Sequence, residues 1–256
     1  MNPGPWLSIK ETLRSLKRGK GGGVKVAILD SGVESSHPCF KGFELQDDLV
    51  FDGNSADVRI EHGQGRDLYG HGTAICSILR RVAPQARIGS FRILQGNLRG
   101  RPELARAAAA EALKRGYHIL NCSFGLSHPD WIHVYQSWTN LAYQRGAHVV
   151  AASNNTDSCR VEYPASLATV IGVTIAPGCP EEELRIRTGM LIELGTSGED
   201  IDVAWQGGGR KLVTGSSYAA AYVSGLLARL LSCHSGLDPW TAKALLRLAA
   251  APWVLR

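Results

Sequence analysis

Apolar residues recur along the chain in two patterns that alternate. Short, nearly continuous apolar runs rich in valine, isoleucine and alanine predict buried strands of a parallel sheet. These runs cover residues 24–30, 86–94, 118–125, 147–153 and 168–173. Longer segments carry apolar residues at helical spacing and predict helices. These segments cover residues 71–83, 102–116, 130–146, 216–234 and 239–251.

The order of the segments predicts the fold class. Strands alternate with helices over most of the chain, which is typical of a mostly parallel central sheet with helices on both faces. A length of 256 residues is within the range of one large α/β domain. We therefore expect a single α/β domain, with functional residues in the loops at the carboxyl ends of the strands.

The start of the chain differs from the rest. Apolar positions among basic residues over residues 5–18 predict a short surface helix, and the glycine-rich sequence of residues 19–23 ends it. We therefore expect residues 1–23 to form a helical arm with a glycine-rich hinge, and residues 24–256 to form the main domain.

Composition and charge argue against several classes of protein. The hydrophobic fraction of 44% and the charged fraction of 20% are those of a globular domain. The formal charge of +5 is mild, and aromatic residues do not interleave with the basic ones, so we expect no nucleic-acid partner. No segment is long enough to span a membrane, and the N-terminus lacks a secretory signal. We therefore expect no membrane association and a cytoplasmic location.

The six cysteines do not indicate a metal site. None belongs to a C-x-x-C pair, so a structural zinc site has no support. An even number would permit three disulfides. However, several cysteines lie in apolar runs, where a free cysteine acts as a small buried hydrophobe. Reduced thiols fit an intracellular protein.

Three side chains with catalytic chemistry lie at predicted element ends. Asp30 ends an apolar strand, His71 lies between glycines at a helix start, and Ser217 lies near the start of a long helix. Taken singly, each residue is weak evidence for catalysis, because strand-end aspartates, structural histidines and helix-capping serines are common. Together they are the side chains of a nucleophile, its general base and an orienting acid.

Longer motifs around these residues resemble one protein family, the subtilisin-like serine proteases or subtilases. The resemblance covers about residues 24–228, in the order Asp, His, Asn, Ser that is typical of subtilases. The motifs are VAILDSGV, HPCF, YGHGTAICSIL, VAPQARIGSFRIL, ILNCSFG, VVAASNN, YPASLATVIGV and TGSSYAAAYVSG.

The resemblance implies a role for each catalytic residue. Ser217 would attack the scissile carbonyl, His71 would act as general base, and Asp30 would orient the imidazole. The side chain of Asn154 and the backbone N–H of Ser217 would bind the oxyanion.

The resemblance also implies a substrate cleft. One wall would pair with the substrate backbone as an added strand, the other would line the first specificity pocket, and Glu162 would favour Lys or Arg before the scissile bond. The alternative is that Glu162 is solvated. The wall residues are Ser123, Phe124 and Gly125 on one side and Ala151, Ala152 and Ser153 on the other.

The chain departs from the usual subtilase motifs near the nucleophile. Ser216, Tyr218 and Ala221 stand where Thr, Met and Pro are common. Tyr218 adds bulk beside the nucleophile. We expect Cys76 and Cys122, which lie close to the predicted site, to be buried and inert.

Subtilases often bind calcium, and the acidic segments 46–48 and 61–67 are possible sources of oxygen ligands. Solvated loops are the default interpretation, so we assign no metal residue and expect no cofactor. Residues 1–23 have three interpretations: a short pro-segment, an arm over the cleft, or a surface helix.

The sequence thus predicts a serine endopeptidase that forms an acyl-enzyme with a peptide or protein substrate. We expect limited processing of a peptide or protein precursor. Two alternatives stay open: an inactive binding module with the same fold, and an acyl-transfer macrocyclase or ligase with the same triad.

Overall fold

The computed structural model describes residues 7–54 and 57–253. The helices are α1 (Ile9–Arg18), α2 (His71–Val82), α3 (Pro102–Lys114), α4 (Ile132–Gln144), α5 (Ser216–Cys233) and α6 (Pro239–Ala249). Strands of the main sheet are β1 (Lys25–Asp30), β2 (Asp48–Asn54), β3 (Asp57–His62), β4 (Arg87–Arg92), β5 (Ile119–Cys122), β6 (His148–Ala152), β7 (Val170–Ile175), β8 (Arg185–Ile186), β9 (Leu194–Thr196) and β12 (Ala251–Pro252). A separate hairpin contains β10 (Ile201–Trp205) and β11 (Gly209–Val213). Short 3-10 helices cover Pro38–Phe40 and Pro129–Trp131.

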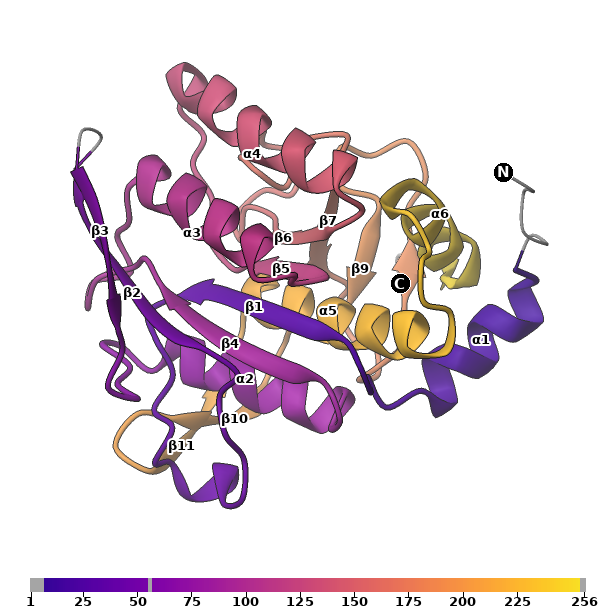
Figure 1. Ribbon diagram of the computed structural model, residues 1–256. Helices are drawn as coiled ribbons and strands as arrows, with labels where there is room; N and C mark the ends of the chain where they lie inside the picture. The colour runs from indigo at the N-terminus through magenta and orange to yellow at the C-terminus, as the bar shows by residue number, and fades with distance from the viewer. Residues whose placement is uncertain (1–6, 55–56, 254–256) are drawn as a thin grey trace.

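The main sheet confirms the predicted fold class. Its strands lie in the order β12-β8-β9-β7-β6-β5-β1-β4-β2-β3. Neighbouring strands are parallel except in the pairs β2–β3 and β8–β9. Helices α3 and α4 cover one face, and α2 and α5 cover the other (Figure 1). The chain is therefore a doubly covered, mostly parallel α/β domain.

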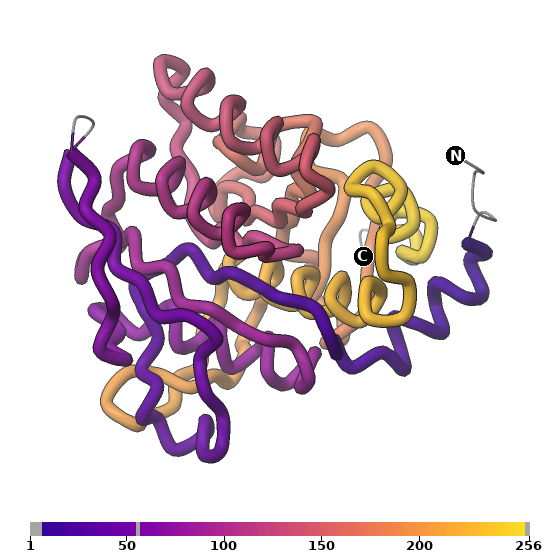
Figure 2. Tube along the Cα trace, in the orientation of Figure 1, coloured from indigo at the N-terminus to yellow at the C-terminus, as the bar shows by residue number. Residues whose placement is uncertain are grey.

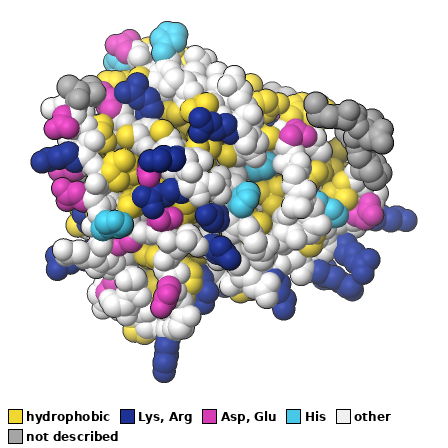
Figure 3. All heavy atoms as spheres, in the orientation of Figure 1, with side chains coloured by type: hydrophobic (Ala, Val, Ile, Leu, Met, Phe, Trp, Pro, Cys, Tyr) yellow, Lys and Arg dark blue, Asp and Glu magenta, His cyan; other side chains and the backbone are white. Residues whose placement is uncertain are grey.

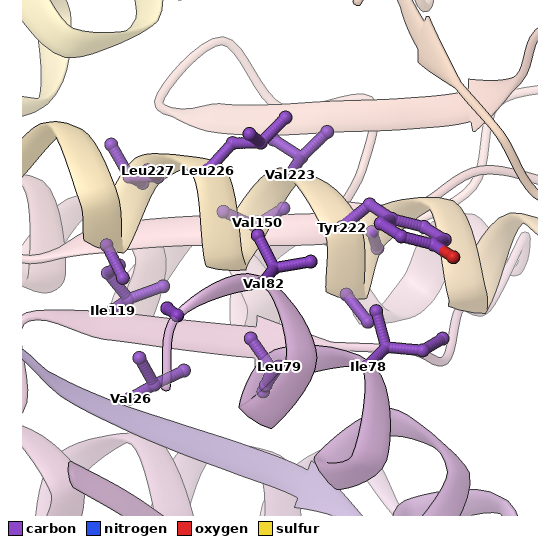
Figure 4. Packing of buried hydrophobic residues seen from close by; sticks show 14 of the residues in the cluster. Val26, Ile78, Leu79, Val82, Ile119, Val150, Tyr222, Val223, Leu226 and Leu227 are labelled. Carbon is purple, nitrogen blue, oxygen red and sulfur yellow. The ribbon is translucent and has the colours of Figure 1, made fainter. Parts of the chain in front are cut away.

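Helix α5 is buried in the core and packs beside α2 on the same face of the sheet. Its apolar side chains belong to one buried cluster with those of α2 and of the strands; Figure 4 shows Val82 of α2 next to α5 and Val150 of β6 behind it. Small residues allow the two helices to approach closely: a Cβ added at Gly225 would lie 2.7 Å from the Val82 side chain. A rigid, fully packed α5 fixes the position of its first turn, where Ser217 lies.

All five predicted strands and all five predicted helices of the main domain are present, with ends shifted by a few residues. Hairpins β2–β3 and β10–β11 were not predicted. Strand β3 is exposed along nearly its whole length and carries mostly polar residues. Edge strands of this kind lack the apolar run that identifies a buried strand.

The N-terminal arm contains α1, inside the predicted range 5–18, of which residues 5 and 6 lie outside the described part. A reciprocal capping box between Ser8 and Glu11 starts the helix. Ser15 Oγ lies 2.8 Å from Nε2 of His234, just beyond the last turn of α5, and Arg229 donates to the Leu16 carbonyl at 3.0 Å.

The described part of this arm thus packs at the opposite end of α5 from Ser217 and does not cover that helix start (Figure 2). This packing agrees with the surface-helix interpretation. No helix in the described ranges is long and apolar enough to cross a membrane. Lys and Arg side chains are interspersed with Asp and Glu on the face shown in Figure 3.

Candidate active site

The carboxyl ends of three neighbouring strands bring the predicted site residues to one edge of the sheet. Asp30 is the last residue of β1, Ser123 directly follows β5, and Asn154 follows β6 by two residues. These strands are parallel neighbours, so their ends meet. Strand β1 lies where the strand order reverses, and open α/β sheets form their sites at such a point.

Asp30 and His71 form a buried, hydrogen-bonded pair. Nδ1 of His71 lies 2.8 Å from Oδ1 and 2.9 Å from Oδ2 of Asp30. His71 is the first residue of α2 and follows Gly70, which has a φ of 107°. A Cβ at Gly70 would lie 2.6 Å from the Trp205 ring, so both backbone conformation and space require glycine there.

The surroundings of His71 change its proton affinity. Burial by itself lowers the pKa of His71. The negative charge of Asp30, its hydrogen bond and the charge of Asp67 outweigh burial, so the pKa of His71 is raised above its ordinary value. An imidazole in this position is therefore a stronger base than a free histidine.

Ser217 lies in the first turn of α5 and is only partly buried. Its hydroxyl donates to the Ser123 carbonyl at 3.2 Å, so in this structure it bonds to the β5 loop and not to His71. The next residue, Tyr218, packs against the imidazole with ring centroids 5.6 Å apart. The start of α5 therefore lies directly against the Asp30–His71 pair.

The side chain of Asn154 is held at its oxygen and presents its amide nitrogen to the site. Oδ1 accepts from the backbone N–H groups of Thr156 at 2.9 Å and Asp157 at 3.0 Å. Nδ2 lies 3.4 Å from Oε1 of Glu162. The two bonds to Oδ1 fix the donor group in one orientation.

A cavity of about 220 Å³ is lined by Ser217, Asn154 and Glu162. It contains every predicted substrate-binding residue named for the cleft except Ala151. The described lining consists of Ser123, Phe124, Gly125, Ala152, Ser153, Asn154, Asn155, Thr156, Glu162, Ser216 and Ser217.

The structure places Ala151 outside this lining and Glu162 within it. Ala151 was expected to line the pocket, but it is fully buried in the core beneath α3 and α4, because successive strand residues face opposite sides. Glu162 is half-buried in the wall against Gly125 rather than freely solvated. Burial raises the pKa of Glu162, and the hydrogen bond from Asn154 partly offsets this effect.

Two residues that support the site were not predicted. Asn155 Oδ1 accepts from the backbone N–H of Ser216 at 2.7 Å and from its hydroxyl at 2.9 Å, which ties the β6 loop to the start of α5. Asp67 binds the loop before α2. The only signal in the sequence is their position: Asn155 directly follows Asn154, and Asp67 lies four residues before His71.

The two cysteines near the site are buried, which keeps their thiols protonated and away from solvent. Cys76 and Cys122 are fully buried, as expected, and burial raises the pKa of both thiols. All six cysteines of the chain are free.

The acidic segments considered for calcium are engaged within the protein. Asp47 bonds to Arg115 at 2.6 Å and to the Tyr117 hydroxyl at 2.6 Å, and Asp48 accepts from the Gly65 N–H at 2.7 Å. Within residues 7–54 and 57–253, no group of three or more His, Cys, Asp or Glu side chains converges as metal ligands.

The sequence and the fold of this chain are similar to those of one family of known proteins. Residues 21–253 match the subtilase family. Subtilisin BL of Lederbergia lenta is 28% identical over 235 residues, which cover 88% of this chain and 82% of the relative. M-protease of Shouchella clausii is 27% identical over 88% of this chain and 58% of its own length.

Solved structures show the same fold. A cold-adapted subtilisin-like serine proteinase has a TM-score of 0.73 at 23% identity, covering 90% of this chain and 83% of that one. Sphericase has a TM-score of 0.75 at 23% identity, covering 88% and 82%. The family match spans nearly the whole chain and includes the strands and helices that carry Asp30, His71 and Ser217. The chain therefore belongs to the subtilase family and is a serine endopeptidase of the subtilisin-like class.

Proposed function

We propose that the protein cleaves peptide bonds through an acyl-enzyme formed on Ser217, with His71 as general base and Asp30 as its orienting acid. The observation that carries this proposal is the buried Asp30–His71 pair, which lies against the start of α5 beside a cavity lined by Ser217. This arrangement supplies a base of raised pKa next to a partly exposed hydroxyl.

Proton transfer follows from the geometry of the pair. Nδ1 of His71 is held by Asp30, so Nε2 is the nitrogen available to Ser217. Ser217 Oγ turns from the Ser123 carbonyl to His71, a change in one side-chain torsion, and attacks the scissile carbonyl as its proton passes to Nε2. The imidazolium is stabilised by the carboxylate of Asp30 and then protonates the leaving amine. Water repeats the sequence to release the acid product.

Two hydrogen-bond donors are available to stabilise the negative charge on the tetrahedral intermediate. Asn154 lines the cavity and carries the donor Nδ2, and the backbone N–H of Ser217 lies at the N-terminus of the 18-residue helix α5. Unpaired N–H groups and the helix dipole favour negative charge at such a terminus. These donors stabilise the transition state more than the neutral substrate.

Labelling with a fluorophosphonate tests the proposal directly. We expect the folded wild type to form one covalent adduct, mapped by peptide mass spectrometry to Ser217, because only an activated serine attacks this reagent. Heat-denatured protein and Ser217→Ala should not react. A folded wild type that stays unlabelled, or labels at another serine, contradicts the proposed triad.

The charge in the pocket sets the substrate preference that we propose. Glu162 is half-buried in the wall of the cavity, where its carboxylate is suited to pair with a Lys or Arg side chain. We expect kcat/KM for peptides with Lys or Arg before the scissile bond to exceed that for Phe or Leu by about 10- to 100-fold. In Glu162→Gln, the ratio of kcat/KM between these two groups of peptides should fall close to one.

The control for the pocket is Glu61→Gln, the same change on the exposed strand β3, which should leave the ratio unchanged. The test is to measure kcat/KM on four peptides that differ only in the residue before the scissile bond, which is Lys, Arg, Phe or Leu. A wild-type preference for Phe or Leu, or a Glu162→Gln enzyme that still prefers Arg, rejects the pocket assignment.

We propose limited processing of a peptide or protein precursor, at accessible segments with Lys or Arg before the scissile bond. Ser123, Phe124 and Gly125 supply the wall along which the substrate backbone extends as an added strand. The six free cysteines support a reducing, cytoplasmic location.

A further inference from the structure

Asp67 lies in the loop before α2, and its carboxylate is saturated with hydrogen bonds. Oδ1 accepts from the backbone N–H groups of Tyr69 at 3.0 Å and Gly70 at 2.8 Å. The same oxygen accepts from the hydroxyl of Ser31 at 2.7 Å. Because Ser31 directly follows Asp30, one carboxylate oxygen joins the end of β1 to the loop that leads into α2.

The second oxygen of Asp67 holds the first turn of α2. Oδ2 accepts from the backbone N–H of Thr73 at 2.8 Å and from its hydroxyl at 2.6 Å. Ser31 Oγ also accepts from the N–H of Gly72 at 3.1 Å. Gly70, the N-cap of α2, makes no side-chain cap, so Asp67 supplies the cap from three residues before it.

These contacts connect both members of the Asp30–His71 pair to one hydrogen-bond network around the partly buried carboxylate of Asp67. The residue after Asp30 and the residues on both sides of His71 are bound to Asp67 or to Ser31. A rigid connection matters because general-base catalysis depends on the orientation of the imidazole to within a fraction of an ångström.

We propose that Asp67 is a positioning residue for the proposed triad, which locks the start of α2 against the end of β1 and supplies a second negative charge to the imidazolium of His71. This inference rests on the function proposed above. Asp67 itself touches neither substrate nor the reacting atoms.

The charge component follows from the groups that face His71. Asp30 reaches it from β1, Asp67 acts from the loop before α2, and the uncharged ring of Tyr218 packs on it from α5. Both carboxylates stabilise the protonated imidazole and raise the pKa of His71. Removal of the Asp67 charge therefore lowers that pKa, and the acid limb of the pH profile moves to lower pH.

Asp67→Asn tests the inference, with kcat/KM measured from pH 4 to pH 9 on one peptide. We expect the acid limb to move down by about half a pH unit or more, and kcat at pH 8 to fall about tenfold or more, because a less basic and less fixed imidazole accepts the proton poorly. Thr73→Val is the matched control: it removes one hydrogen bond to Asp67 and keeps the charge, so the acid limb should stay in place.

Each result has a defined meaning. Active-site titration with fluorophosphonate counts the folded, competent molecules, so rates are expressed per labelled molecule before the apparent pKa is fitted. Asp67→Ser provides the same loss of charge if Asp67→Asn does not fold. A labelled Asp67→Asn enzyme with an unmoved acid limb overturns this inference and leaves the proposed function intact. A wild type that does not label overturns the proposed function itself.

Discussion

Ser217→Ala should lower kcat for peptide hydrolysis by about 10⁵- to 10⁶-fold, the scale on which loss of the nucleophile acts in a serine peptidase triad. The remaining rate reflects substrate binding and the oxyanion donors alone. The fold should be retained, because Ser217 is partly exposed and its hydroxyl makes one long bond, to the Ser123 carbonyl at 3.2 Å. Rates on a fluorogenic peptide and the thermal unfolding midpoint, measured on the same preparation, check both statements.

The matched control is Ser137→Ala, which removes an exposed hydroxyl from α4 and should leave kcat unchanged. His71→Ala should cause a loss similar to that of Ser217→Ala, and the double variant should be no worse than either single one, because the two residues act as a unit. A Ser217→Ala enzyme that keeps about a hundredth of the activity or more contradicts the acyl-enzyme mechanism.

The central part of the fold is predictable from the sequence because burial and periodicity agree there. Strands such as β1 and β6 are buried on both faces, which forces a continuous apolar run. The edge hairpins carry no such constraint. Strand β11 is exposed at four of its five residues, so its sequence reads as a polar loop, and its pairing with β10 became visible only in the structure.

The site is predictable only through its resemblance to known motifs. Asp30, His71 and Ser217 are ordinary residues in isolation, and their convergence depends on strands and helices distant in the sequence. The supporting residues escape the sequence because many of their partners are backbone N–H groups, which every residue type except proline carries. Asp67 binds N–H groups of its own loop together with Ser31, and Asn155 binds the N–H of Ser216, 61 residues away. No pattern of side chains encodes such contacts.

The orientation of the Ser217 hydroxyl also cannot be predicted from the sequence. A motif places the hydroxyl at the start of α5, but only the structure shows that it donates to the Ser123 carbonyl. Catalytic hydrogen bonds are often unformed until substrate is bound. We therefore expect bound substrate to favour the productive orientation of the hydroxyl.

Asn154→Ala should lower kcat by about 10²- to 10³-fold and leave KM nearly unchanged, the signature of a donor used only in the transition state. Nδ2 is the group lost, but alanine also removes Oδ1, which accepts from Thr156 and Asp157 and shapes the loop. Asn140→Ala, which removes an exposed amide at a distant position on α4, is the matched control and should keep full activity.

Asn154→Asp separates the donor from the loop. The aspartate keeps an acceptor oxygen for both backbone N–H groups, while its second oxygen replaces the amide nitrogen 3.4 Å from the carboxylate of Glu162. If Asn154 acts as the oxyanion donor, aspartate should be at least as damaging as alanine, since it replaces a donor by a negative charge that repels the developing oxyanion. Recovery of kcat in Asn154→Asp would assign the loss to the loop instead, and stopped-time assays of kcat and KM on one Arg peptide distinguish the two results.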